Sequence, residues 1–295
     1  MSDTLESLRR KITGASDLES VVRTMKVLAA SNIAQYEKAV NSLADYYRTV
    51  ELGLLVCFQK SGDLTSTEKV WQSKSETIDA VVFGSDQGLV GQFNDTLAEY
   101  AGRFLYNLDG EKRIWAIGER IQARLEDFGL PIAGILQVPN SVNTITPLVG
   151  QILLENESLR KNGEISQMYV FHNKPKSGAI YEPFVQHLLP LDEKWRTNIA
   201  KLKWPTYNIP EAINGVEPAL HGLIRQYLFI SLFRSCAESL ASENASRLAA
   251  MQRAEKNIDE LLEDLNRAFH RLRQSTIDEE LFDVISGSEA LSSGK

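Results

Sequence analysis

Cysteine and long hydrophobic runs are both scarce in this sequence. Cys57 and Cys236 are its only cysteines, and they lie far apart in apolar helical patterns. We therefore expect two buried free thiols and no disulfide framework. The longest apolar run extends from Leu52 to Phe58, far short of the roughly 20 apolar residues that a membrane-spanning helix needs. The sequence predicts a soluble chain.

A surplus of positive charge is also missing. The formal net charge is -7, whereas a nucleic-acid-binding protein gathers Lys and Arg to meet the phosphates. The start, MSDTLESLRRK, has no apolar core of a secretory signal, and its acidic residues are unlike a transit peptide. We expect synthesis and folding in the cytoplasm and no nucleic-acid partner.

Proline is absent from the first segment, residues 4–59, where apolar side chains recur at steps of three and four residues. This spacing predicts one long amphipathic helix. Its apolar positions are Leu5, Leu8, Ile12, Ala15, Leu18, Val22, Met25, Ala29, Ile33 and Tyr36.

The same spacing returns after Pro218 and persists to Ile285, which predicts a second long helix that ends near Gly287. At 1.5 Å per residue the two helices would reach roughly 80 Å and roughly 100 Å, too long for the inside of a globule. Pairing as a coiled coil along a 3.5-residue seam is the simplest explanation. The longer C-terminal helix must then overhang, and its apolar stripe needs an outside partner.

The middle of the chain alternates short β-rich runs with helical patterns. This alternation predicts a small α/β domain with a largely parallel sheet. We expect strands at 78–85, 113–118, 132–138, 167–173 and 181–189, and helices at 92–108, 119–128 and 146–159. The segments 62–75 and 190–218 are expected to be linkers.

The loop from Gly84 to Gly91 lies between a predicted strand and a predicted helix, where dinucleotide-binding folds hold pyrophosphate. Its glycines are spaced G-x-x-x-G-x-x-G, which matches neither nucleotide fingerprint, and no lysine follows. A tight turn is the favoured interpretation. Ser85 does not occupy the central position of a G-x-S-x-G elbow, so a hydrolase nucleophile is not expected.

No metal site is predicted either. The histidines have no metal-ligand spacing with each other or with the cysteines, and the acidic residues near the C-terminus have the pattern of a solvated helix face. Arg267, Arg271 and Arg273 likewise have the pattern of a polar face. The histidines are His172, His187, His221 and His270, and the acidic residues are Asp278, Glu279, Glu280 and Asp283.

Three stretches resemble the gamma subunit of rotary F-type ATP synthases, in the form of a divergent bacterial branch. Residues 24–31, TMKVLAAS, resemble the family's A-M-x-M-V-A-A-S/A, and residues 84–94, GSDQGLVGQFN, resemble S-D-R-G-L-C-G-x-x-N. Residues 239–251, SLASENASRLAAM, resemble S-L-A-S-E-x-A-A-R-M-x-A-M, and the similarity continues through residues 273–291.

This resemblance implies a fold and a function. The terminal helices would form an antiparallel coiled coil, and the middle would be a small Rossmann-like α/β domain. The chain would be the central rotor shaft that couples rotation of the membrane c-ring to conformational change in the alpha/beta ring. Catalysis would reside in the beta subunits, so this chain would be no enzyme and would need no cofactor. The epsilon subunit would bind it, and the complex would lie peripherally on the cytoplasmic side of the inner membrane, attached only through the c-ring.

The resemblance also implies roles for individual residues. Met25, Arg247, Arg273 and Gln274 match residues associated with the alpha/beta ring, and Arg273 with Gln274 would hydrogen-bond the beta subunit. Around Met25 this sequence has fewer basic residues than the family pattern has. The segment 207–211 matches a foot segment loosely, which implies that Tyr207 and Glu211 contact the c-ring.

Two other functions remain open from the residues alone. The chain could be a nucleotide-binding α/β enzyme on a coiled-coil dimerisation stalk, or a coiled-coil adaptor that forms a symmetric dimer. In all three cases we expect an N-terminal coiled-coil helix at 1–60, an α/β domain at 76–190 and a C-terminal coiled-coil helix at 211–290.

Overall fold

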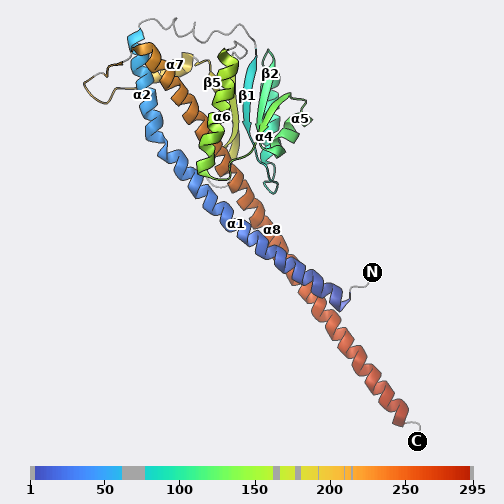
Figure 1. Ribbon diagram of the computed structural model, residues 1–295. Helices are drawn as coiled ribbons and strands as arrows, with labels where there is room; N and C mark the ends of the chain where they lie inside the picture. Colours follow the sequence, from blue (N-terminus) through green and yellow to red (C-terminus); the bar gives the residue numbers. More distant parts are fainter. Residues whose placement is uncertain are drawn as a thin grey trace. The chain divides into compact units, whose positions relative to one another are not determined.

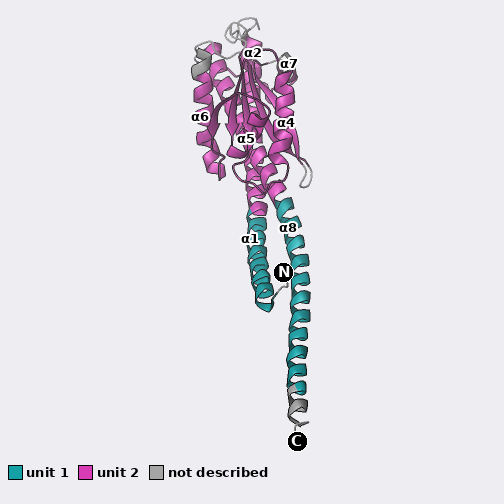
Figure 2. Cartoon of the chain, turned by 90° about the vertical axis from the view of Figure 1, so that its right-hand side faces the viewer, with its two compact units in different colours: residues 1–28, 248–295 teal, residues 29–247 magenta. Residues whose placement is uncertain are grey.

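The computed structural model describes residues 4–61, 77–161, 167–176, 181–191, 193–208, 210–213 and 215–292. The chain divides into two compact units, which are coloured separately in Figure 2. Unit 1 comprises residues 1–28 and 248–295, and unit 2 comprises residues 29–247. The domain ranges expected from the sequence stay predictions, and the expected linker 62–75 lies outside the described residues.

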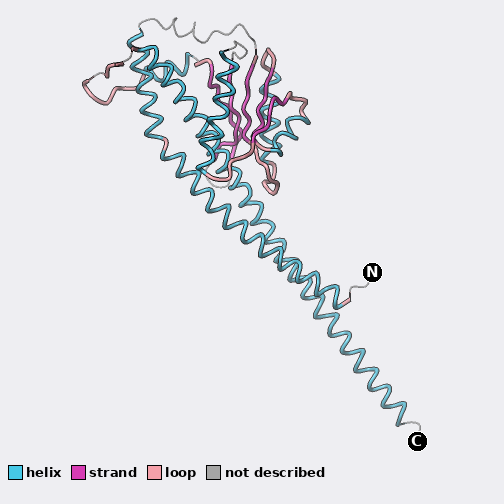
Figure 3. The backbone as a smooth tube through the Cα atoms, viewed as in Figure 1, coloured by secondary structure: helices cyan, strands magenta, loops and turns pink. Residues whose placement is uncertain are grey.

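Helices dominate the chain, and the strands all lie in its middle (Figures 1 and 3). The elements in chain order are α1 (Leu5–Ser42), α2 (Ala44–Ser61), β1 (Ile78–Phe83), α4 (Phe93–Tyr106), β2 (Lys112–Ile117), α5 (Glu119–Asp127), β3 (Ile132–Leu136), α6 (Val142–Lys161), β4 (Gln167–Pro175), β5 (Tyr181–Leu189), α7 (Glu193–Ala200) and α8 (Val216–Ser292).

The single N-terminal helix expected over residues 4–59 is wrong, because the helix breaks at Leu43. The Ser42 hydroxyl donates a 2.8 Å hydrogen bond to the Ala39 carbonyl, which the Leu43 amide would bond in a regular helix. The Leu43 amide bonds the Val40 carbonyl instead, at 3.2 Å. A serine side chain therefore ends α1 without proline or glycine.

The expected linker 190–218 is also wrong in part, because it contains α7 and the first turn of α8. Pro218 is the third residue of α8, a position where the missing amide hydrogen costs no intrahelical bond. The apolar pattern after Pro218 therefore marked the helix but not its start.

A five-stranded sheet forms the centre of unit 2, in the order β3-β2-β1-β4-β5. The pairs β1 with β2, β1 with β4, and β2 with β3 are parallel, and β5 is antiparallel to β4. The largely parallel sheet that we expected is what the structure contains, with one antiparallel edge strand.

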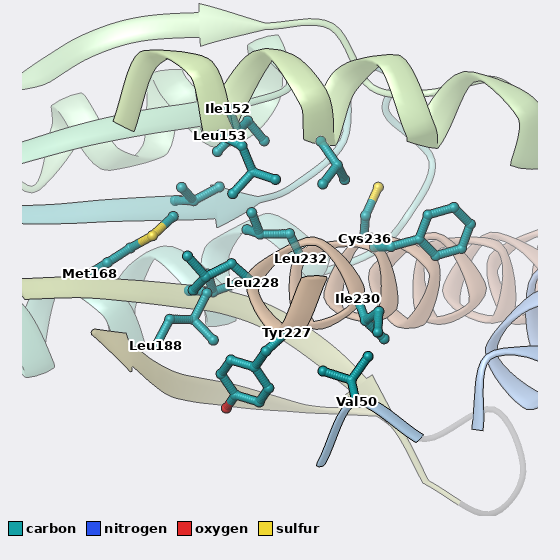
Figure 4. Close-up of a cluster of buried hydrophobic side chains, with 14 of the residues drawn as sticks. Val50, Ile152, Leu153, Met168, Leu188, Tyr227, Leu228, Ile230, Leu232 and Cys236 are labelled. Atoms are coloured by element: carbon teal, nitrogen blue, oxygen red, sulfur yellow. The ribbon is translucent and has the colours of Figure 1, made fainter. Parts of the chain in front are cut away.

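Apolar side chains project from both faces of this sheet. On β1, Val81 and Phe83 point into a cluster with α2, α6 and α8, whereas Ala80 and Val82 point into a cluster with α4 and α5. Figure 4 shows part of the first cluster, in which Val50, Leu188 and Tyr227 lie close together. The sheet is thus covered on both sides, as parallel sheets require.

The helices α1 and α8 run antiparallel within each unit. In unit 1, the Arg9 guanidinium lies 5.9 Å from the centre of the Phe269 ring, and the Lys26 ammonium bonds Glu255. In unit 2, the Asn32 side-chain amide of α1 donates to Asn244 of α8 at 3.4 Å, and the Tyr46 hydroxyl of α2 donates to Gln226 at 2.8 Å. Residue numbers of the partners fall on α8 as they rise along α1 and α2, which is the antiparallel arrangement of the predicted fold class.

Candidate functional site

The helix pair of unit 1 packs through a seam whose positions alternate in steps of three and four residues. This is the 3.5-residue spacing of a coiled coil. On α1 the seam positions that are buried or half-buried are Leu5, Leu8, Ile12, Ala15, Glu19, Val22 and Lys26. On α8 they are Met251, Glu255, Ile258, Leu262, Leu265, Phe269, Leu272 and Thr276.

The seam differs from the apolar pattern of the sequence at two places. Glu19 and Lys26 occupy seam positions, while Leu18 and Met25 are 59% and 36% exposed. After Ala15, two sets of positions one residue apart could continue the seam: one contains Leu18 and Met25, and the other contains Glu19 and Lys26. The periodicity of the sequence fits both sets equally. The facing residue on α8 determines which set lies in the seam, because Glu255 bonds Lys26.

A layer of charge crosses the seam at this level. The Lys26 ammonium lies 2.5 Å from one carboxylate oxygen of Glu255, and the Arg23 guanidinium lies 3.8 Å from the other. Glu19 pairs with Arg23 at 2.5 Å on the same helix. A polar layer inside an apolar seam fixes which residues stand opposite each other, because any other register leaves a half-buried charge unpaired.

The apolar side chains displaced from the seam form an exposed stripe on α1. Leu18, Val21, Met25 and Leu28 are between 36% and 59% exposed, and their spacings of three, four and three residues place them on one helix face. An exposed apolar stripe of this kind is typical of a surface that packs against another molecule. Met25, expected at a partner contact, lies in the middle of this stripe.

Beyond the seam, α8 continues as a single helix, as Figures 1 and 2 show. Thr276 is the last half-buried seam residue, and every side chain from 277 to 286 is exposed. We call residues 277–292 the tip. Its exposed apolar residues are Ile277, Leu281, Phe282, Val284 and Ile285.

Arg273 and Gln274 lie immediately before the tip, between the seam residues Leu272 and Thr276. Both are exposed. In the part of the chain that the structure describes, no ion pair or hydrogen bond is formed by either side chain, whereas Arg267 bonds Asp264 at 2.9 Å. The Arg273 guanidinium therefore has its five donors available for an outside acceptor.

The motif at residues 239–251 has a structural role within unit 2 that the sequence analysis missed. Three buried serines of α8 donate to backbone carbonyls of the sheet region: Ser239 to Phe83 at 3.0 Å, Ser242 to Asn173 at 2.9 Å, and Ser246 to Val90 at 2.5 Å. Their spacing of three and four residues on a helix was the available signal, because it puts three small donors on one face.

Arg247 lies in unit 2 and bonds its own helix. Its guanidinium donates to the Glu243 carboxylate at 2.6 Å, and its side chain is only 16% exposed. Burial raises the pKa of Glu243, while Arg247 acts against that shift. Arg247 is thus mostly buried and already paired with Glu243, and a contact of Arg247 with a partner stays a prediction.

The loop after β1 is a tight turn whose polar groups bond each other. The Ser85 amide donates to Asn94 at 3.0 Å, and the Asn94 amide group donates to the Ser85 hydroxyl at 2.8 Å. Leu89 and Gly91 have φ values of 63° and 59°, the left-handed conformation that short turns use. The tight-turn interpretation agrees with this geometry.

Asp86 links the loop after β1 to two neighbouring segments of unit 2. One carboxylate oxygen accepts from the Glu119 amide at the start of α5, and the other accepts from the Val138 amide, both at 3.0 Å. A helix N-terminus attracts anions, and here the anion belongs to the chain itself. The Asp86 carboxylate thus caps α5, the helix after β2, and ties the loop after β1 to it; α4, the helix that follows this loop, starts at Phe93.

Comparison with known proteins shows which family has this sequence and architecture. The sequence profile of the family described as ATP synthase matches residues 4–291, nearly the whole chain. The chain belongs to this ATP synthase family. A protein named ATP synthase gamma chain from Anaeromyxobacter sp. is 25% identical over 306 residues, which cover 97% of this chain and 99% of that protein. The protein of the same name from Syntrophobacter fumaroxidans is 27% identical over 301 residues, 98% of this chain and 99% of that protein.

Solved structures share the fold. A chain of the Euglena gracilis mitochondrial ATP synthase OSCP/F1/c-ring structure has a TM-score of 0.63 at 17% identity, with coverage of 99% of this chain and 95% of that chain. A chain of the Tetrahymena thermophila mitochondrial central stalk and c-ring structure has a TM-score of 0.56 at 21% identity, with coverage of 79% and 99%. The predicted fold and the predicted resemblance to the gamma subunit are confirmed.

In this member of the ATP synthase family, the expected foot residues Tyr207 and Glu211 lie between α7 and α8. Both are exposed, as is Ile213 in the same segment, and Trp204 is held there by hydrogen bonds to Thr206 and Asn208 at 2.8 Å. Tyr207 and Glu211 belong to unit 2, whereas Met25, Arg273 and Gln274 belong to unit 1.

Both cysteines are buried free thiols, as expected, and burial raises their pKa values. Among the described residues, no three acidic, histidine or cysteine side chains gather as metal ligands. None of the described helices combines the length and the hydropathy that crossing a bilayer requires.

A buried histidine ties the sheet of this ATP synthase family member to α8. The ring Nε2 of His172 on β4 lies 2.9 Å from Glu238, whose other oxygen accepts from Arg234 at 2.7 Å. Burial lowers the pKa of His172, as do the charges of Lys174 and Arg234, against the opposing effect of Glu238. Burial acts to raise the pKa of Glu238, but the bonds from His172 and Arg234 outweigh it. A neutral imidazole thus donates to an ionised carboxylate.

This arrangement predicts a loss of stability in mild acid. The unfolded chain protonates His172 near pH 6.5, whereas the folded chain resists protonation, so the free energy of unfolding falls as the pH falls below about 6.5. We expect the free energy of unfolding of His172→Gln to fall less between pH 6.5 and 5 than that of wild type, as measured by urea unfolding. His221→Gln is the control, because His221 is exposed on α8. An unchanged pH profile in His172→Gln would contradict the assignment.

Proposed function

We propose that this chain is the central rotor shaft of an F-type ATP synthase. The observation that carries the proposal is the tip, where α8 outlasts its helical partner and leaves apolar side chains in water. An exposed apolar helix end on an otherwise paired coiled coil fits insertion into a surrounding ring of subunits. Relatives named ATP synthase gamma chain over almost the full length support the same function.

The partners follow from this role. The alpha and beta subunits would surround the tip and the paired helices of unit 1. The epsilon subunit and the c-ring would bind unit 2. Catalysis would reside in the beta subunits, and this chain would contribute no catalytic residue and no cofactor site. The complex would lie peripherally on the cytoplasmic side of the inner membrane, and this chain would meet the membrane only through the c-ring.

The mechanism rests on the asymmetry of the tip. At about 100° per residue, Ile277, Leu281 and Ile285 lie within one arc, Glu279 and Asp283 lie on the opposite side, and Glu280 lies between the two. Three equivalent catalytic subunits would therefore each meet a different face. Since a contact can shift an equilibrium only by its differential affinity for the two states, rotation would bias each subunit in turn.

Individual residues receive roles in the proposal. Met25 and the exposed stripe around it would contact the beta subunit, and Arg273 with Gln274 would hydrogen-bond it near the tip. Arg247 would stabilise the pairing of α1 and α8 beneath the contact with the beta subunit, because little of its side chain is exposed. Tyr207 and Glu211, both exposed, would contact the c-ring.

The enzyme alternative is less well supported by the loop after β1. Because Asn94 occupies the Ser85 amide of this loop and no lysine follows the loop, we expect no nucleotide binding by the isolated chain. Isothermal titration calorimetry with ATP and ADP should give no heat of binding at micromolar concentrations. Binding in that range would favour the enzyme on a dimerisation stalk.

Coexpression with alpha and beta subunits tests the proposal against the adaptor. We expect one copy of the chain in a complex with both subunits, and ATP hydrolysis that depends on its presence, by native mass spectrometry and a coupled assay. A replacement of Ile277, Leu281 and Ile285 by serine should weaken this assembly, whereas a replacement of Glu279, Glu280 and Asp283 by serine should weaken it less. A symmetric dimer that ignores alpha and beta would refute the rotor.

A further inference from the structure

The buried serines of α8 make directional bonds at the edge of the sheet where β1 and β4 end. Ser239 meets the last residue of β1, Ser242 meets Asn173 near the end of β4, and Ser246 meets Val90 in the loop after β1. These three hydroxyls are no more than 8% exposed. Two turns of one helix are therefore tied to three separate backbone segments of unit 2.

A fourth tie lies on the same stretch of α8. Glu238 precedes Ser239 and bonds His172 of β4 at 2.9 Å. The apolar cluster around α8 also holds the helix against the sheet, but burial of apolar surface is non-directional. Hydrogen bonds weaken steeply when the donor angle changes. The serines and Glu238 therefore add a directional resistance to rotation of α8 about its own axis, beside the resistance of the packed apolar side chains.

The segments that accept these bonds are themselves braced. The loop that carries Val90 is held by the reciprocal bonds of Ser85 and Asn94, and Asp86 links it to the amides of Glu119 and Val138. A force on Ser246 is thus transmitted to the start of α5 and to Val138, two residues after β3. The Asn173 side chain adds a bond to the Phe93 carbonyl at the start of α4, at 3.0 Å.

We propose that Ser239, Ser242 and Ser246 form the joint through which torque passes between the sheet of unit 2 and α8. The inference rests on the proposed rotor function, in which the sheet region is turned by the c-ring and α8 acts on the catalytic ring. The serines are positioning residues: they touch no substrate, and they keep the angle of the shaft equal to the angle of the foot.

The test is the triple variant Ser239→Ala, Ser242→Ala, Ser246→Ala in the complete ATP synthase complex in membrane vesicles. We expect ATP hydrolysis within twofold of wild type, ions pumped per ATP at least threefold lower, and ion-driven ATP synthesis about tenfold lower. Ser235→Ala is the matched control, because Ser235 is equally buried on α8 and forms no side-chain hydrogen bond among the described residues. It should pump as wild type does.

A purely structural role would give a different result. In that case the triple variant would melt at a lower temperature but would pump as many ions per ATP as wild type, and the inference would be overturned. Hydrogen exchange on the isolated chain provides a readout without partners: amides of residues 239–247 should exchange at least threefold faster in the triple variant than in Ser235→Ala, and equal exchange overturns the joint.

Failure of the proposed function is recognisable separately. A wild-type chain that does not assemble or pump would overturn the rotor and this inference together, whereas a well-coupled triple variant overturns the inference alone. If the triple variant does not assemble, Ser242→Ala alone takes its place. A lower number of ions per ATP in that single variant supports the joint, and an unchanged number refutes it.

Discussion

Gly84→Ala is expected to destabilise the chain by at least about 3 kcal/mol, or to prevent folding, because the site has no room for a methyl group. A Cβ atom at Gly84 would lie 2.2 Å from the Cβ of Ile121 and 2.8 Å from the Asn94 side-chain oxygen. No rotamer change moves the Ile121 Cβ, so α5 itself would have to shift. Urea unfolding followed by circular dichroism measures the effect.

Gly150→Ala is the control for this prediction. Nothing lies within 4 Å of a Cβ at Gly150, which is in the interior of α6. We expect this variant to gain about 0.5 to 1 kcal/mol from helix propensity. If the two variants unfold at the same urea concentration, the close approach of Gly84 to α5 does not limit the size of the residue at position 84.

Replacement of Arg273 and Gln274 together by alanine is expected to lower ATP turnover of the reconstituted complex roughly tenfold or more, with assembly nearly intact. A charged hydrogen bond contributes about 1.5 to 3 kcal/mol, and about 1.4 kcal/mol corresponds to tenfold in rate when the contact is made only at the rate-limiting rotor angle. Assembly rests on the apolar stripe and tip and should tolerate the loss. Turnover is measured on complexes of verified stoichiometry.

Arg267→Ala serves as the comparison for the double variant. Arg267 lies on the same helix and is exposed, but its guanidinium already bonds Asp264 and it lies outside the matched pair. Its turnover should equal that of wild type. Equal turnover in the double variant as well would show that Arg273 and Gln274 do not have the proposed role.

The fold was largely predictable, because it depends on periodicity that any long segment displays. The strand Tyr181–Leu189 was expected at the bounds that the structure has, and β1 ends two residues earlier than expected. The break at Leu43 was not predictable, since it depends on whether one serine hydroxyl competes for a helix carbonyl. Helix α7 was missed because prolines on both sides of it suggested a linker.

The candidate site was predictable in outline and not in detail. Periodicity alone allowed Leu18 and Met25 in the seam, and the charge of Glu255 on a segment more than 200 residues away placed Lys26 there instead. Such a choice requires the register between the two helices, which the sequence of one helix does not contain. The serines of α8 were visible as a motif, but their acceptors are backbone carbonyls, which have no signature in a sequence.

The lone tip has a consequence for the supply of this chain in a cell. A single helix of about this length is marginal in water, so a copy without partners would fray from the C-terminus and present Phe282, Val284 and Ile285 to proteases and to other copies. Copies made in excess of the ring would be degraded or would aggregate. The abundance of the chain would therefore follow the supply of the subunits that enclose its end.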